Sequence, residues 1–121
     1  THGEYPESFV AEVCSSVEDH SYQGPVTDLS LETQCLIEAD LLDKVGANGT
    51  TLMILRMGYE ARTHMDAAEM VQRVLERGRE HASRVESDAA ESIAHERIKR
   101  VKWFREWLED EVADMDRERD P

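Results

Sequence analysis

Apolar side chains follow a helical period along almost the whole chain, and this period constrains the fold more than any other feature. They recur three and four residues apart, the spacing that places side chains on one face of an α-helix. No stretch alternates apolar and polar residues in the manner typical of a β-strand. We therefore expect an all-α protein, a bundle of about five helices that residues 1–121 form as a single domain.

Glycine, proline and capping residues divide the pattern into five segments. Gly24 and Pro25 cannot continue a helix, and Asp28 or Ser30 can cap the one that follows. Gly58 is a suitable stop for a short third helix, and Thr63 can cap a fourth. The predicted helices span about residues 7–20, 31 to the glycines at 46 and 49, 50–58, 65–86 and 88–117.

The charge balance excludes some classes of partner. The formal net charge is -13, from 27 acidic and 14 basic residues. Such a surface argues against a nucleic-acid polymer as the main partner, because phosphate backbones are bound by basic residues. The chain shows no signal peptide and no apolar run long enough to cross a bilayer. We expect a cytoplasmic protein that does not bind membranes.

Two cysteines are too few for a disulfide framework. Cys14 lies on the apolar stripe between Val10 and Val17, and Cys35 follows Leu31 by one helical turn. Free cysteine behaves as a small apolar residue. We therefore predict that both cysteines are reduced and buried.

The stretch "EADLLDKVGANG", residues 38–49, places two carboxylates and two glycines at equal spacing. Apolar neighbours crowd Asp40, and a carboxylate at the edge of a core needs a partner. That partner could be a metal ion, a helix end or a cation, and Lys44 is placed to form an ordinary i,i+4 pair with Asp40. Asp43 is expected to accept backbone N–H bonds from the glycine turn or to pair with a buried arginine. Gly46 and Gly49 mark either a break or a close approach of another backbone.

Three further features have both a structural and a functional interpretation. His20, at the end of the first helix, either interacts with the helix dipole or contacts a phosphate or second metal. His81 is expected to be a hydrogen-bonded core residue. The segment "ERIKRVKWFREW" concentrates positive charge beside two tryptophans. It is either a solvated face paired with nearby glutamates or a site for a phosphate or partner.

Three stretches resemble the small bacterial and archaeal branch of the HD-domain metal-dependent phosphohydrolases. "EADLLDKVGANG" is similar to the family's "DADRLDAIGAIG" block. "YPESFVAEVCSSVEDHSYQG" resembles the helix and loop that precede this block, and "DAAESIAHERIKRVKWFREWLE" resembles the family's final helix. The order and spacing agree over nearly the whole chain. The resemblance implies that the helical bundle is HD-domain-like.

The resemblance also implies roles for individual residues. By position Asp40 would be a ligand of a divalent metal ion, and Asp43 would be a supporting acid that fixes the turn. Gly46 and Gly49 would allow close helix packing beside the metal, and His20 would lie near a second metal or a phosphate. The chain departs from the family at Glu38 and Leu41, which stand where the family has an aspartate and a basic residue. The family's upstream histidine and His-Asp motifs have no counterpart in this sequence.

The implied function is hydrolysis of a nucleotide or another small phosphate ester, with the divalent ion activating water. Because ligands are missing, we expect this sequence to be either the C-terminal part of a longer enzyme or a divergent chain without the chemistry. The alternative is a non-catalytic helical module for binding or oligomerisation that kept the HD scaffold. Apolar faces that upstream helices would cover lead us to expect a homo-oligomer.

Overall fold

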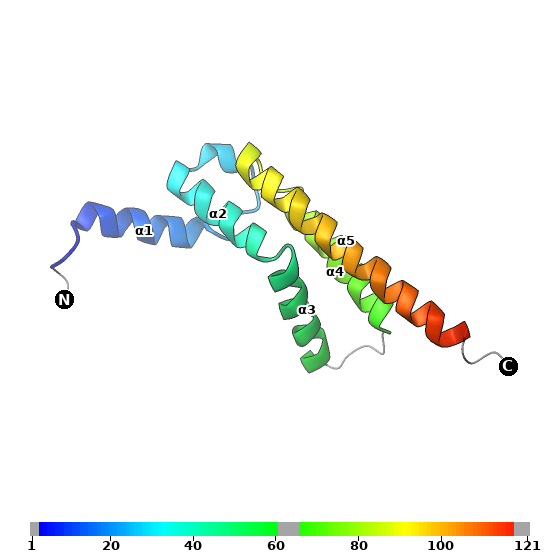
Figure 1. Ribbon diagram of the computed structural model, residues 1–121. Coiled ribbons are helices and arrows are strands. Elements are labelled where there is room, and N and C mark those ends of the chain that lie inside the picture. The colour runs from blue at the N-terminus through cyan, green and yellow to red at the C-terminus, as the bar shows by residue number, and fades with distance from the viewer. Residues whose placement is uncertain (1–2, 61–65, 118–121) are drawn as a thin grey trace. The chain divides into compact units, whose positions relative to one another are not determined.

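The computed structural model describes residues 3–60 and 66–117, apart from the side chain of Asp116 (Figure 1). These residues form five α-helices and one short 3-10 helix and contain no strand, which confirms the all-α prediction. The proposed cap at Thr63 lies outside the described residues, as do His2 and His64.

The helix bounds agree with the prediction at most ends. The first, second and fifth helices begin and end within about one turn of their predicted positions. The third helix begins earlier than predicted, at Ala47, and continues past the expected stop at Gly58 to Glu60. The elements are α1 (Glu7–Asp19), η1 (Val26–Asp28), α2 (Leu31–Asp43), α3 (Ala47–Glu60), α4 (Ala67–Ala82) and α5 (Asp88–Arg117).

Polar side chains cap several of these helices. The Ser30 hydroxyl accepts from the backbone N–H of Thr33, 3.2 Å away, as an N-cap does. At the start of α4, Asp66 and Glu69 form a reciprocal capping box, which satisfies two backbone donors. The Ser87 hydroxyl accepts from the N–H of Ala90 at the start of α5. The helix α4 ends at Ala82, earlier than the predicted residue 86.

The chain divides into two compact units, Thr1–Asp40 and Leu41–Pro121, and the boundary falls within α2. In the first unit the Ser16 and Thr33 hydroxyls lie 2.9 Å apart and join α1 to α2. The buried side chains of this unit include Val26, Thr33 and Ile37.

The helix α1 has no buried residue, which corrects one prediction. Phe9 and Val17 lie on its apolar stripe and are 47% and 54% exposed. Cys14 lies on the same helix, so it is free but exposed and not buried as predicted. Cys35 is also free and exposed. Thr33 and Ile37 form the buried face of α2. Cys35 lies two residues from each of them, and a helix places residues two apart on nearly opposite faces. Cys35 therefore lies on the side away from the buried face.

The second unit is built around α4. This helix packs against both α3 and α5, and α3 also contacts α5. The apolar stripe predicted for α4 is buried from Val71 to Gly78, and Val101 of α5 is buried as well. The remaining buried residues of this unit are Leu41, Val45, Gly46, Gly49, Thr50, Ala90 and Ala94.

The last turns of α5 expose apolar side chains. With 30 residues against 16, α5 is roughly 45 Å long and α4 roughly 24 Å, so α4 cannot cover the whole of α5. Trp107 and Met115 are 64% and 59% exposed as a result. No helix within residues 3–60 and 66–117 is long and apolar enough to cross a membrane.

Candidate functional site

The turn that joins α2 to α3 depends on Gly46. Its φ of 93° lies in the left-handed region, where residues with a Cβ are strained. The N–H groups of Lys44 and Val45 bond the Leu41 and Leu42 carbonyls, which tightens the last turn of α2. The Gly46 carbonyl then accepts from Thr50 N–H, 2.9 Å away, and this bond starts α3. One glycine therefore ends one helix and begins the next.

Gly49 is required for a different reason, the close approach of the Lys44 backbone. A Cβ at this position would overlap the carbonyl oxygen of Lys44, which is a backbone atom that cannot rotate away. The sequence left two interpretations of the glycine pair open, a chain break and a close backbone approach. The structure confirms both, the first at Gly46 and the second at Gly49.

A long-range hydrogen bond anchors the turn. The Arg97 guanidinium of α5 donates to the Leu42 carbonyl oxygen over 2.5 Å, although the two residues are 55 positions apart. The Leu42 carbonyl already accepts from the Val45 N–H, so the guanidinium fills its second acceptor position. The guanidinium also places a positive charge at the negative end of the helix dipole. Its aliphatic part also passes 3.0 Å from where a Gly46 Cβ would stand, so Gly46 must be small. Sequence reasoning did not identify Arg97 as this partner.

Asp43 is placed differently from what the sequence suggested. Its carboxylate accepts a hydrogen bond from the Asn48 side-chain amide, 2.8 Å away, and it is exposed. The arginine that reaches this turn bonds the neighbouring carbonyl and not a carboxylate. Asp43 therefore links the end of α2 to the first turn of α3 from the solvent side.

Asp40 lies one helical turn before the end of α2 and is half-buried. His20 is the C-cap residue of α1, and its ring Nδ1 donates to the Val17 carbonyl oxygen. This contact is the one expected of a histidine that interacts with a helix C-terminus. The predicted roles of Asp40 and His20 at a metal or phosphate remain predictions.

The part of the chain that the structure describes contains no group of three or more His, Cys, Asp or Glu side chains that could hold a metal ion. Divalent cations need several converging ligands, and a single half-buried carboxylate is not a binding site by itself. The described residues thus do not fit a complete divalent-metal centre. Asp40 can contribute only one ligand.

A groove of about 550 Å³ lies beside the turn, within the second unit. The turn, the first two turns of α3 and one face of α5 form its walls. Arg97 and Arg100 supply two cations, and Asp43 supplies one anion. The other lining residues are Val45, Gly46, Ala47, Asn48, Thr50, Thr51, Ile54, Val101 and Phe104. We call this feature the arginine groove.

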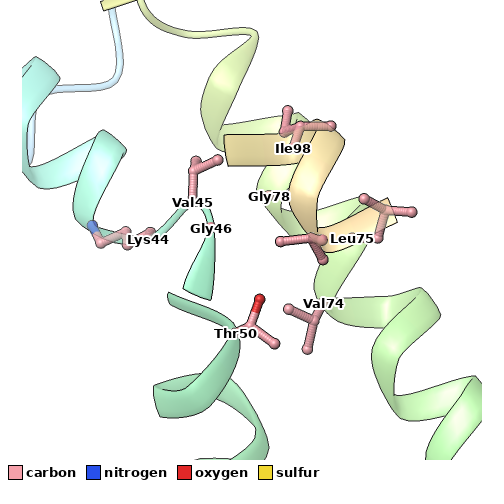
Figure 2. Close-up of a pocket in the computed structure, with 9 residues that line it drawn as sticks. Lys44, Val45, Gly46, Thr50, Val74, Leu75, Gly78 and Ile98 are labelled. Carbon is pink, nitrogen blue, oxygen red and sulfur yellow. The ribbon is translucent and has the colours of Figure 1, made fainter. Parts of the chain in front are cut away.

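A smaller cavity of about 10 Å³ adjoins the arginine groove, since the two share Val45, Gly46, Thr50 and Val101 in their linings. Figure 2 shows the Thr50 oxygen pointing into this cavity between Gly46 and Leu75. Thr50 is 9% exposed, and no hydrogen-bond partner for its hydroxyl is found among the described residues. The cavity is about the size of one water molecule.

The basic segment of α5 shows the paired, solvated face that one interpretation predicted, and a site for a phosphate or partner remains a prediction. Arg105 pairs with Glu109 at 2.7 Å, as a solvated helix face does. Lys99 lies 5.2 Å above the Trp103 ring, a cation–π contact. Arg97 and Arg100 instead line the arginine groove, three residues apart on one face of the helix.

The half-buried His81 of α4 has a lowered pKa. Burial lowers its pKa below the usual value, the nearby cations Lys44, Arg77 and Arg84 lower it further, and Glu80 partly opposes them. The neutral imidazole is therefore favoured in the folded protein.

Comparison of the chain with protein-family models, with curated proteins and with solved structures finds no match. What the site can do is argued below from its own residues and geometry.

The close backbone contact at Gly49 leads to a prediction about stability, with Gly58 as the control. Gly49→Ala should lower stability by about 2–4 kcal/mol, because its methyl group would force the Lys44 backbone to move. Gly58→Ala is the control, since nothing lies within 4 Å of the point where its Cβ would stand and alanine favours a helix. It should raise stability by up to about 1 kcal/mol. Urea unfolding measures both. Equal effects of the two substitutions would contradict the close approach at Gly49.

The second prediction concerns pH. Because the folded-state pKa of His81 lies below the unfolded value of about 6.5, the unfolded chain binds more protons between the two. The stability contributed by neutral His81 is fully present above that unfolded value and is lost as pH falls through the folded pKa. His81→Gln should therefore flatten the fall in unfolding free energy between about pH 7 and pH 5. His95→Gln, at an exposed position of α5, is the control. An unchanged slope in His81→Gln would refute the assignment.

Proposed function

We propose that this chain contributes one metal ligand, Asp40, to an HD-type phosphohydrolase whose other ligands come from polypeptide outside residues 1–121. The substrate class is a nucleotide or another small phosphate ester. The observation that carries the proposal is the position of Asp40, a half-buried carboxylate one turn before an anchored helix end. The resemblance of residues 38–49 to the family's metal-binding block supports the same role.

The end of α2 suits a ligand-bearing helix. A ligand must be held in place by its scaffold before the ion arrives. The Arg97 bond to Leu42 fixes the carbonyl two residues after Asp40, and Gly46 and Gly49 let α3 begin within a short turn. The close contacts with Arg97 and with the Lys44 backbone explain the presence of Gly46 and Gly49 on structural grounds alone. The metal role therefore rests on Asp40 and must be tested there.

The test uses the full-length product of the gene that encodes this chain. Asp40→Asn keeps the shape of the side chain and removes its charge. We expect it to reduce the bound divalent metal and to lower hydrolysis of a phosphate monoester by at least ~100-fold, with an unchanged thermal unfolding curve. Asp28→Asn, at an exposed position of η1, is the matched control and should retain both. Full activity in Asp40→Asn would remove this residue from the site.

The second candidate function is a non-catalytic helical module that associates through apolar faces. The specific observation in its favour is α1, where no residue is buried although Phe9, Val10, Val13 and Val17 form an apolar stripe. Trp107, Val112 and Met115 continue the pattern of exposed apolar side chains at the end of α5. Exposed apolar surface of this kind is typical of interaction sites.

The proposal of a self-associating helical module leads to a prediction about oligomeric state. The net charge of -13 opposes association at low salt, and added salt screens this repulsion. We therefore expect a homo-oligomer that tightens as ionic strength rises, measured by light scattering at low and at molar salt. Val13→Asp should shift the equilibrium toward monomer, whereas Glu12→Asp, its exposed neighbour, should not. A monomer under both conditions would count against self-association.

A further inference from the structure

We propose that the arginine groove binds a small organic phosphate, namely a phosphate monoester carried on an apolar body. The groove consists only of residues of the second unit, and Asp40 is not among them. The inference therefore does not depend on metal binding at Asp40. It assigns a ligand to a surface that the phosphohydrolase proposal does not use.

The charges in the groove favour an anion. Arg97 and Arg100 both face it, against one carboxylate, Asp43, which already accepts from Asn48. No ion pair joins Arg100 to any described residue, whereas Arg56, Arg77, Arg105 and Arg117 are paired within their own helices. Arg73 and Arg79 of α4 likewise form no ion pair with a described residue, but they do not line the groove. The guanidinium has five N–H donors in a planar fork, which matches the geometry of a phosphate.

The N-terminus of α3 adds donors to the same groove. Ala47 and Asn48, the first residues of α3, line it, and the first N–H groups of a helix have no partner within that helix. The residue before them is Gly46, which has no side chain to cap them. The helix dipole places partial positive charge at this point, so backbone and arginines favour an anion together.

The buried Thr50 hydroxyl lies beside the groove and has no hydrogen-bond partner among the described residues. A hydroxyl that is removed from water without a partner costs free energy, so such groups in native proteins usually have a reason. Thr50 lines the groove and points its oxygen into the adjoining small cavity (Figure 2). A ligand oxygen or a water molecule held beneath the ligand would satisfy it.

The apolar residues in the lining of the groove explain why the ligand should carry an apolar body. Ile54, Val101 and Phe104 line the groove, and Phe104 is 46% exposed. An aromatic ring next to a phosphate-binding end suits a flat or aryl group. The volume of about 550 Å³ is far larger than inorganic phosphate needs and is ordinary for a small-molecule site.

Titration of the 121-residue chain with phenyl phosphate, in phosphate-free buffer, tests the proposal by calorimetry and amide NMR. We expect phenyl phosphate to bind about tenfold more tightly than either inorganic phosphate or phenol, because only it engages both ends of the groove. The amide signals of residues 47–50 should shift most. Tighter binding of inorganic phosphate, or shifts confined to other segments, would overturn the proposal.

Three variants separate the groove from net charge and from the metal site. Arg100→Gln should weaken phenyl phosphate binding about tenfold, the effect of losing a charge-assisted hydrogen bond. Arg73→Gln removes the same charge from an exposed position of α4 outside the groove, and binding should hold. Asp40→Asn should also keep binding, even where it abolishes hydrolysis by the full-length enzyme. Equal losses in Arg100→Gln and Arg73→Gln would show a net-charge effect only, and loss in Asp40→Asn would place the anion elsewhere.

Discussion

The hydrogen bond from Arg97 to the Leu42 carbonyl ties together two parts of the second unit that are far apart in the sequence. It joins the last turn of α2 to the middle of α5 and so closes a segment of 55 residues. The Leu42 carbonyl also accepts from the Val45 N–H, so Arg97 is its second donor. The guanidinium supplies a charge-assisted bond, which is stronger than a neutral one. Gly46 is required by the same contact, because a Cβ there would meet the arginine side chain.

Helix positions were predictable because local chemistry specifies them. Ser30 caps α2 and the apolar stripe of α4 is buried, and both follow from residues three or four positions apart. The burial of α1 was not predictable in this way. A helical period shows that one face is apolar, but it does not show whether another element covers that face. Cys14 was placed in the core for this reason, and the structure exposes it.

The candidate site was predictable only in part. The sequence indicated that Gly46 and Gly49 had a geometric purpose, because glycine is costly near a helix unless the backbone requires it. It did not indicate that Arg97 was the partner, since a contact over 55 residues leaves no local pattern. The basic segment of α5 was recognised, but its division into paired residues and groove residues needed the position of α3.

The turn that contains Gly46 and Gly49 matters for both proposals, the metal ligand at Asp40 and the anion in the arginine groove. A metal ligand at Asp40 needs the end of α2 to be rigid, and the Arg97 bond provides that rigidity. An anion in the arginine groove needs an uncapped start of α3, and Gly46 provides it because it has no side chain. The two demands are compatible, since one concerns the carbonyl end of α2 and the other the N–H end of α3. Opposite helix ends carry opposite partial charges. The turn therefore joins the C-terminus of α2, which favours cations, to the N-terminus of α3, which favours anions. Arg97 bonds the first terminus with one of its donors, and the same residue lines the groove beside the second terminus.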